Sequence, residues 1–481
     1  MAMKLGVVSG DGLPVSGLLT VFRNVVDIGV RRGLVDTPVA ADLGYSWRPD
    51  KGAFYPDGAP VAGYPDWLWV STAPPAGADP ERLRPLWREV RDQVADPSRL
   101  DGGELQALRG RIEELAEVYR EHFRTWLDDH EIDWVVAINM TLSDAVPVTA
   151  GLQAAVRERF GDGGRPGGVL FWDHDLFGSC AIFENGLRIY PEVPNELIPV
   201  PQKNAYTEWA VVSSELAAEA LRYPTDAKPS VVPNVLPAGV REPLGERHRE
   251  FARHWRLDLS RPVVLCPVRV FRVKGVDLSL ELLAATRREC ARLGRPLPYL
   301  LVFGSLDEDP DYAAEITDLV ARLDLAEDVR FLDGVPLGSY QDARGTWVLD
   351  EVDLLRLAAA TEGMVFFTPS TPDVETIGLG PALASLAHLP CATTYYTAFE
   401  QVYGMDYRVL RAGRSASDMR AAGAQVARVL HDRQARYEAG GNGANVELLS
   451  SLFPEQPWLE LLRNLHATLT RGAAPTDGGS R

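Results

Sequence analysis

The chain has 481 residues, of which 46% are hydrophobic and 24% are charged, proportions typical of a globular protein. At about 100–200 residues per domain, this length predicts two large domains. The 49 Lys and Arg residues against 67 Asp and Glu residues give a formal net charge of −18. Such a surface repels phosphate backbones and anionic lipid, which argues against nucleic-acid or membrane-surface binding as the main role.

Neither the cysteines nor the N-terminus carry a signal for metal binding or export. The cysteines form no CxxC pair and no Cys/His cluster, so we expect no zinc site and no disulfide framework. The N-terminal apolar run is too short for a signal peptide, and nowhere do eighteen apolar residues run together. We therefore expect a cytoplasmic protein without a membrane anchor, a metal or another cofactor.

The first half of the chain alternates between short apolar runs, which are typical of buried strands, and helical patterns. The run at 5–8 is followed by a Gly/Pro/Ser loop at 9–17 and then by apolar residues at helical spacing. Further strands are expected at 67–70, 134–138, 169–172, 210–212 and 231–232, and helices at 105–130 and 144–160. This alternation predicts a parallel sheet covered on both faces, in a Rossmann-like domain over 1–235.

A second series of the same kind begins after the turn-rich stretch 233–237. The expected strands are 263–268, 299–303, 329–332, 364–367 and 392–394, and the expected helices are 278–293, 312–323 and 381–388, with an extended loop at 333–350. These elements predict a second Rossmann-like domain over 236–445. We expect helices within about 453–471 to pack back on the first domain, and a disordered tail over 472–481.

The strongest chemical signal in the sequence is a pair of cations, Arg269 and Lys274, between an expected strand and the helix that follows it. Two α/β domains place a ligand in the cleft between them, at the carboxyl ends of the strands. An Arg fork and a Lys point charge at such a place suit a diphosphate that gains negative charge as a bond breaks. From these residues alone, a surface loop with two solvated cations is an equally good interpretation.

A second signal is Glu375, followed by Ile377-Gly378-Leu379 and by Pro381 at the expected start of a helix. Glycines allow close approach of a backbone, and a helix start offers unpaired N–H groups. A carboxylate beside such amides suits a sugar with its many hydroxyls. On local evidence alone, an ordinary acid ahead of a helix is the favoured interpretation.

Together these segments resemble the group 1 retaining glycosyltransferases of the GT-B fold. The resemblance lies in 262–400, and its motifs are Arg269-x4-Lys274-Gly275, Pro369-Ser370, Glu375-x-Ile377-Gly378-Leu379 and Ala387-His388-Leu389-Pro390. It implies an α/β architecture of two doubly wound domains facing across a cleft. It also implies that Arg269 and Lys274 hold the donor's diphosphate, and that Glu375 and the amides of Ile377–Leu379 hold the donor sugar. Gly304-Ser305 is similar to a turn of the family at the donor site.

One position departs from the family pattern. The motif places a second acid, which usually grips the ribose of the nucleotide, at position 383, where this chain has Leu383. A leucine side chain cannot accept a hydrogen bond. Another group, such as Glu400 or the backbone, must then hold the ribose, or the donor is not a standard nucleotide sugar.

The first half contains the remaining candidates. Ser16-Gly17 opens the first expected helix, so the Gly17 N–H is a candidate for binding the donor phosphate. By resemblance, His174 is the cleft histidine beside the reacting carbon of the donor; a structural loop histidine is the alternative. Its neighbours Asp173 and Asp175 are candidates for binding the acceptor, and Asn139 is a weaker one, because Asn is also a common turn residue. The aromatic-rich stretch 45–69 either lines the acceptor pocket or anchors a loop.

The resemblance implies transfer of a hexosyl group from a nucleoside diphosphate sugar to a small hydroxylated acceptor, with retention of the anomeric configuration and without a metal. The absence of a membrane anchor favours an acceptor that is a soluble metabolite. Two alternatives remain. One is a phosphorylase-like or unusual-donor transfer, which Leu383 suggests, and the other is a sugar- or nucleotide-binding relative without turnover.

Overall fold

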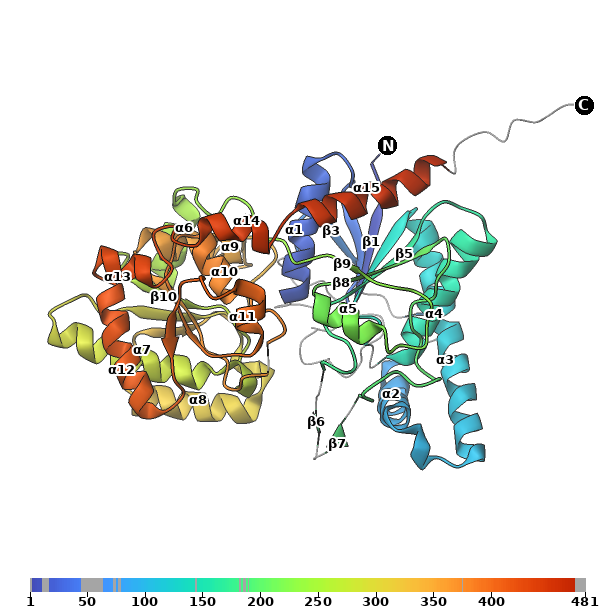
Figure 1. Ribbon diagram of the computed structural model, residues 1–481, viewed down its shortest axis with the longest axis horizontal. Helices are drawn as coiled ribbons and strands as arrows, with labels where there is room; N and C mark the ends of the chain where they lie inside the picture. Colours follow the sequence, from blue (N-terminus) through green and yellow to red (C-terminus); the bar gives the residue numbers. More distant parts are fainter. Residues whose placement is uncertain are drawn as a thin grey trace, which may run out of the picture. The chain divides into compact units, whose positions relative to one another are not determined.

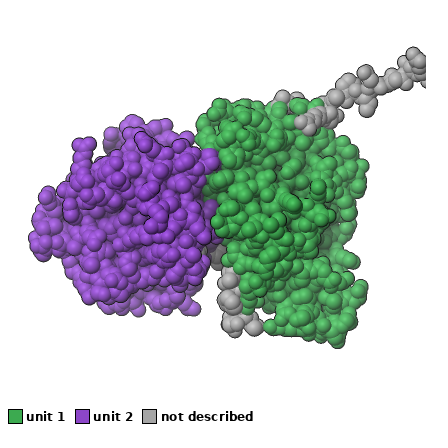
Figure 2. Space-filling model, in the orientation of Figure 1, with its two compact units in different colours: residues 1–234, 455–481 green, residues 235–454 purple. Residues whose placement is uncertain are grey.

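The computed structural model describes residues 2–10, 17–44, 64–71, 75–76, 79–142, 145–180, 183–184, 187–188, 190–373 and 375–471. The chain forms two compact units, unit 1 with residues 1–234 and 455–481 and unit 2 with residues 235–454 (Figure 2). Each unit is built around one parallel β-sheet, which confirms the predicted pair of Rossmann-like α/β domains. The predicted tail at 472–481 lies outside the described residues.

Unit 1 contains a seven-stranded sheet of order β3-β2-β1-β4-β5-β8-β9, in which every pairing is parallel. Its strands are β1 (Leu5–Ser9), β2 (Val39–Asp42), β3 (Leu68–Ser71), β4 (Trp134–Ile138), β5 (Gly168–Asp173), β8 (Thr207–Val211) and β9 (Ser230–Val231). Strands β1, β4 and β5 are buried throughout, as their apolar runs predict. The strand order reverses between β1 and β4, so the carboxyl ends of these strands flank the switch point where doubly wound domains bind ligands.

The helices of unit 1 are α1 (Gly17–Arg31), α2 (Pro80–Ala95), α3 (Gly102–Asp129), α4 (Val146–Val156), α5 (Ser214–Ala220) and α15 (Gln456–Arg471). The helix α15 packs on α1, although more than 400 residues separate them in sequence (Figure 1). Its Trp458 is fully buried, lies edge-to-face on Trp172 of β5 at 4.7 Å between ring centroids, and donates from Nε1 to Pro233 O at 3.0 Å. Helix α15 is therefore part of the core of unit 1.

Unit 2 contains a six-stranded parallel sheet of order β12-β11-β10-β15-β16-β17. Its strands are β10 (Val263–Cys266), β11 (Tyr299–Val302), β12 (Val329–Phe331), β15 (Met364–Phe367), β16 (Cys391–Thr394) and β17 (Leu410–Ala412). Its helices are α6 (Glu246–His254), α7 (Val276–Arg292), α8 (Pro310–Arg322), α9 (Glu351–Ala360), α10 (Gly380–Leu386), α11 (Ala398–Tyr403), α12 (Ala416–Val429), α13 (Arg433–Glu438) and α14 (Val446–Leu452). Here the order reverses between β10 and β15, which pair directly.

Three details of unit 2 differ from the sequence-based expectation. Strand β10 ends at Cys266, two residues before its expected end, so the loop that carries Arg269 is longer than expected. The stretch 333–350, expected to be an extended loop, contains the hairpin β13 (Tyr340–Gln341) and β14 (Trp347–Val348). The helix expected from Pro381 begins one residue earlier and ends at Leu386.

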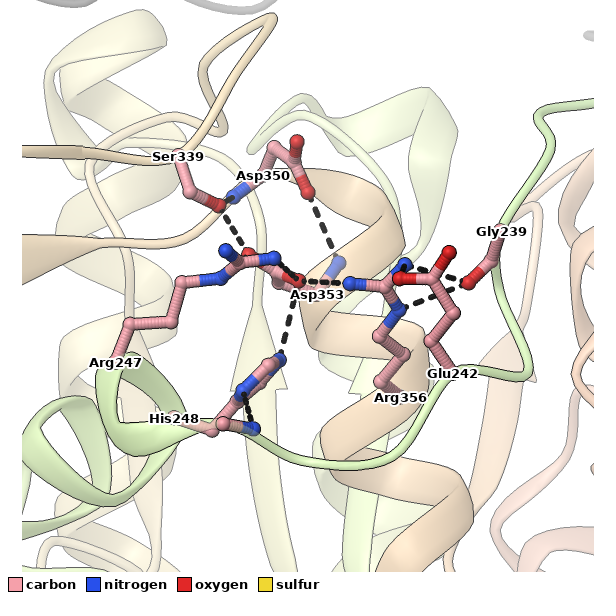
Figure 3. Close-up of polar contacts among 9 residues, drawn as sticks. Gly239, Glu242, Arg247, His248, Ser339, Asp350, Asp353 and Arg356 are labelled. Atoms are coloured by element: carbon pink, nitrogen blue, oxygen red, sulfur yellow. Dashed lines mark hydrogen bonds and ion pairs between the residues drawn. The ribbon is translucent and has the colours of Figure 1, made fainter.

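A buried ion cluster ties the segment that enters unit 2 to α9 (Figure 3). Asp353 of α9 accepts hydrogen bonds from Arg247 at 2.8 Å, His248 at 3.1 Å, Ser339 at 2.5 Å and Arg356 at 2.8 Å. His248 accepts the Gly245 N–H at Nδ1, so its Nε2 carries the proton that faces Asp353. Burial raises the pKa of Asp353, but the donors from His248, Arg247 and Ser339 outweigh it and hold this pKa far below its ordinary value.

Among the described residues, no helix is long and apolar enough to cross a bilayer. No group of three or more His, Cys, Asp or Glu side chains in the same ranges is arranged to hold a metal ion.

Candidate functional site

The loop between β10 and α7 carries both predicted cations of unit 2. A short 3₁₀ turn at Arg272–Lys274 leads to Gly275, which adopts φ 66° and is the N-cap residue directly before α7. A Cβ on Gly275 would lie 1.9 Å from Thr368 O, in the segment that follows β15. Only glycine tolerates both the left-handed conformation and this approach, so Gly275 fixes the loop that carries the cations.

Hydrogen bonds fasten this loop to the segment after β15. The Thr368 hydroxyl donates to Gly275 O at 2.9 Å, and Ser370 N donates to Val273 O at 3.1 Å. This docking brings Lys274 beside Glu375, with Nζ and Oε1 2.7 Å apart. The two residues, separated by 101 positions in sequence, form an ion pair whose side chains are 27% and 10% exposed. The structure therefore brings together two of the predicted catalytic residues.

Arg269 lies at the start of the same loop and remains open to a ligand. Its Nε is 3.6 Å from Glu308 Oε1, and its guanidinium lies over the Phe271 ring at 4.5 Å. Within the described ranges Nε has no hydrogen-bond partner at ordinary distance, and the side chain is 35% exposed. A guanidinium that is held in place and still partly exposed is suited to an anion.

The predicted turn at Gly304-Ser305 packs against the backbone of this loop at Arg269 and Val270. A Cβ on Gly304 would lie 2.5 Å from Val270 N and 2.8 Å from the Arg269 Cα, so only glycine allows β11 to end against the Arg269 segment. Ser305 is buried, and its hydroxyl accepts the Asp307 N–H at 3.2 Å. Direct contact of Gly304 or Ser305 with a donor stays a prediction.

The Gly378 segment is fixed by two buried tyrosines. Gly378 adopts φ 68°, and its carbonyl accepts the hydroxyls of Tyr396 at 3.2 Å and Tyr403 at 2.6 Å. Burial raises the pKa of both hydroxyls, which keeps them protonated as donors. The backbone of Ile377–Leu379 is thereby held rigid just before α10. The predicted contact of these amides with a sugar stays a prediction.

Leu383, the departure from the family motif, lies on α10 and is 5% exposed. It supplies no polar group where the motif has an acid. Glu400, a candidate substitute for that acid, is exposed on α11 and pairs with Arg411 at 3.4 Å. Two interpretations of position 383 are left: backbone groups hold the ribose, or the donor is not a standard nucleotide sugar.

In unit 1, the candidates at the ends of β4 and β5 lie together. Asn139 adopts φ 53° directly after β4, and its Oδ1 accepts the backbone N–H groups of His174 at 2.7 Å and Asp175 at 3.3 Å. Its Nδ2 donates to Asp175 Oδ2 at 3.2 Å. These bonds are those of a turn residue that shapes the loop after β5, which agrees with the alternative interpretation of Asn139. Its contact with an acceptor stays a prediction.

His174 and Asp173 are both buried. The His174 ring lies 4.5 Å from the Trp172 ring, which itself packs on Trp458 of α15. The Asp173 carboxyl is fully buried and accepts the Trp209 Nε1–H at 2.8 Å. Burial raises its pKa to about 7, against opposing hydrogen bonds from Thr141 and Trp209. The roles of His174 beside a donor and of Asp173 beside an acceptor stay predictions.

The raised pKa of Asp173 predicts a pH-dependent stability. Between its ordinary value of 3.8 and about 7, the folded chain holds a proton that the unfolded chain has lost, so stability falls as pH rises through this window. From pH 5 to pH 8 the loss attributable to Asp173 is about 2.5 kcal/mol. Urea unfolding at several pH values checks this: the difference between the unfolding free energies of wild type and Asp173→Asn should change by that amount. An equal pH slope in both proteins contradicts the prediction.

The sequence analysis missed one polar pair at the same edge of the sheet. Asp42, the last residue of β2, is fully buried and lies 2.9 Å from His122 Nε2 of α3. The available signal was an acid directly after the apolar run 39–41.

Among the other candidates, Gly17 is the first residue of α1, while Ser16 and 45–63 of the aromatic stretch lie outside the described residues. Trp69, near the end of that stretch, is 48% exposed and packs on the His130 ring at 4.2 Å.

Comparisons with known proteins bear on the fold. No protein-family model and no curated protein matches the sequence. Among solved structures, sucrose-phosphate synthase from Thermosynechococcus elongatus matches with a TM-score of 0.55 and 14% identity, over 98% of this chain and 100% of that one. HepE from Anabaena, in complex with UDP and glucose, matches with a TM-score of 0.53 and 14% identity, over 97% and 100%. The UDP-forming α,α-trehalose-phosphate synthase from Burkholderia vietnamiensis matches with a TM-score of 0.52 and 13% identity, over 99% of both chains. The chain therefore has the two-domain GT-B fold that its motifs implied.

Proposed function

We propose that this protein is a retaining glycosyltransferase that moves a hexosyl group from a nucleoside diphosphate sugar, with UDP as the nucleotide, to a small hydroxylated acceptor. The observation that carries the proposal is the ion pair between Lys274 and Glu375, with Arg269 open on the same loop. The loops concerned follow β10 and β15, the neighbouring strands at which the order of the sheet reverses. This is the place where a doubly wound domain binds a nucleotide.

Each of these residues has a task in such a transfer. Arg269 and Lys274 stabilise the negative charge that grows on the diphosphate as its bond to the sugar C1 breaks. Glu375, an acceptor-only group when ionised, takes hydrogen bonds from hydroxyls of the donor sugar. The acceptor oxygen bonds to C1 on the face that the phosphate leaves, and its proton passes to the departing phosphate oxygen. No carboxylate base is needed in this scheme.

The choice of UDP rests on the solved structures of the same fold. HepE is described in complex with UDP-glucose, and the trehalose-phosphate synthase is described as UDP-forming. The buried tyrosines that hold Gly378 and the glycine that admits the Arg269 loop support a rigid donor site in unit 2. Hydrogen-bond donors that are already held in place stabilise the developing charge without reorganisation during the reaction.

The proposal is tested by incubating the protein with UDP-glucose, ADP-glucose and GDP-mannose, each with a panel of sugar and cyclitol acceptors. We expect release of UDP that depends on the acceptor, and NMR of the product should show the anomeric configuration of the donor. Product of inverted configuration contradicts the retaining mechanism. Binding of nucleotides without any turnover, across the panel, favours a non-catalytic relative.

A second candidate, phosphorylase-like transfer, is favoured by one observation. Leu383 presents a buried apolar side chain where the motif has a ribose-binding acid. A sugar 1-phosphate has no ribose, and its phosphate would meet the same two cations, Arg269 and Lys274. Transfer from glucose 1-phosphate with release of inorganic phosphate, without turnover of any nucleotide sugar, would replace the first proposal by this one.

A further inference from the structure

The segment between β11 and the middle of α8 contacts the cation-bearing loop and the start of α7 at three points. Glu308, at the end of the 3₁₀ turn Leu306–Glu308, accepts the Val270 N–H at 2.7 Å and lies beside Arg269. Further along, Tyr312 accepts the Asp277 N–H at 3.0 Å. Glu315 forms a bidentate pair with Arg272, at 2.6 and 2.8 Å.

Of the two acids, only Glu308 is buried. Its side chain is 3% exposed, whereas that of Glu315 is 59% exposed. A buried carboxylate is unfavourable unless hydrogen bonds and opposite charge compensate it. Burial raises the pKa of Glu308, and the charge of Arg269 and the Val270 amide oppose that shift. The carboxylate is thus stabilised by the segment that carries Arg269.

The geometry around Arg269 shows what this carboxylate does for the site. Glu308 approaches the inner nitrogen, Nε, at 3.6 Å, and Nε is itself buried. The Phe271 ring covers one face of the guanidinium at 4.5 Å. The two terminal nitrogens are thereby left for a ligand, while a long side chain that would otherwise sample many rotamers is held by charge on one side and by the ring on the other.

We propose that Glu308 is the positioning residue of the donor site: it orients the Arg269 guanidinium toward the diphosphate and does not itself touch the donor. This inference rests on the proposed function. It deepens that function, because it makes the affinity of Arg269 for a diphosphate depend on a carboxylate that lies outside the recognised motifs. In this proposal its negative charge affects the donor only through Arg269.

A merely structural role of Glu308, through the backbone groups of Val270 and Ser305, is the competing explanation. Glu308→Gln separates the two, because a glutamine Oε1 still accepts the Val270 N–H but carries no charge for Arg269. Glu315→Gln is the matched control. It also removes an acid from this segment, but that acid pairs with the exposed Arg272 and not with Arg269. Arg269→Ala and the double variant Arg269→Ala/Glu308→Gln complete a double-mutant cycle.

The test measures the affinity for UDP by calorimetry on the full chain, with the melting temperature of each variant as a check of folding. We expect Glu308→Gln to weaken UDP binding about tenfold in the wild-type background and not at all in the Arg269→Ala background. Glu315→Gln should bind as wild type does. Equal loss in both backgrounds, or no loss in either, overturns the inference.

Two further outcomes are distinguishable. If wild type binds UDP and Glu308→Gln binds it equally well, the inference fails and the proposed function stands. If wild type binds no UDP at millimolar concentration, the proposed donor fails, and the inference fails with it. Should Glu308→Gln not fold, Glu308→Asp replaces it: this variant keeps the charge but retracts it, and it must weaken UDP binding only where Arg269 is present.

Discussion

Replacing Lys274 by Ala is expected to lower turnover by about 100- to 1,000-fold while the protein stays folded. Loss of one charged partner of a transition state typically costs about 2.7–4 kcal/mol. The variant also leaves Glu375, whose side chain is 10% exposed, as an unbalanced negative charge beside an anionic donor. The measurement is kcat and kcat/KM with the nucleotide sugar that the donor panel identifies, together with the melting temperature.

The loop supplies its own control for this experiment. Arg272 lies two residues before Lys274 and carries the same charge, but its guanidinium is 58% exposed and paired with Glu315. Arg272→Ala changes the net charge equally and should leave kcat within about twofold, because exposed ion pairs contribute little. Near-normal turnover in Lys274→Ala, or an equal loss in Arg272→Ala, contradicts the role assigned to Lys274.

The strands of both sheets were predictable where apolar runs are continuous. Trp134–Ile138 and Met364–Phe367 have the predicted limits because fully buried parallel strands need apolar residues on both faces. Strand β2, only four residues with the sequence Val-Ala-Ala-Asp, is too short and too poor in large side chains to stand out. A short strand of small residues therefore escapes a local pattern even when it lies inside the sheet.

The helix α12 shows a second reason why elements escape a sequence pattern. It packs on α7 through small residues: a Cβ on Gly423 would lie 2.5 Å from the Ala285 Cβ. Of the residues that α12 buries, Ala422, Gly423 and Ala427 are small and only Met419, Val426 and Val429 are larger, so its apolar stripe is weak for a periodicity analysis. Ser415 at its N-terminus, which forms a capping box with Asp418, is the signal that remains.

The same distinction applies to the candidate site. Arg269, Lys274 and Glu375 stand in motifs of recognisable spacing, so the sequence alone could single them out. Glu308 lies in the stretch Asp307-Glu308-Asp309, which is typical of a solvated surface turn. Its significance comes from its burial against Arg269, which depends on the neighbour relation of β10 and β11. Contacts between loops on adjacent strands have no signature within either loop.

Replacing Asp353 by Ala is expected to lower the unfolding free energy by about 3–5 kcal/mol, the typical effect of removing one member of a buried ion cluster. The variant leaves Arg356, 8% exposed, and the buried Nε2–H of His248 without the carboxylate that accepts from both (Figure 3). Urea unfolding followed by circular dichroism measures the effect. Because the chain has two units, the transition that belongs to unit 2 is the one to compare.

The exposed edge of the cluster provides the control, and acid provides a second test. Glu242 also pairs with Arg356, but its side chain is 65% exposed, so Glu242→Gln should cost no more than about 1 kcal/mol. The lowered pKa of Asp353 means that its contribution is complete above its ordinary value of 3.8 and is lost as pH falls toward the folded-state pKa. The stability difference between wild type and Asp353→Asn should therefore shrink in acid.

The cluster holds α9 and the entering segment rather than the cation-bearing loop. Asp353→Asn should therefore bind UDP as wild type does wherever unit 2 is still folded. Weaker binding there would show that the cluster also acts on the donor site.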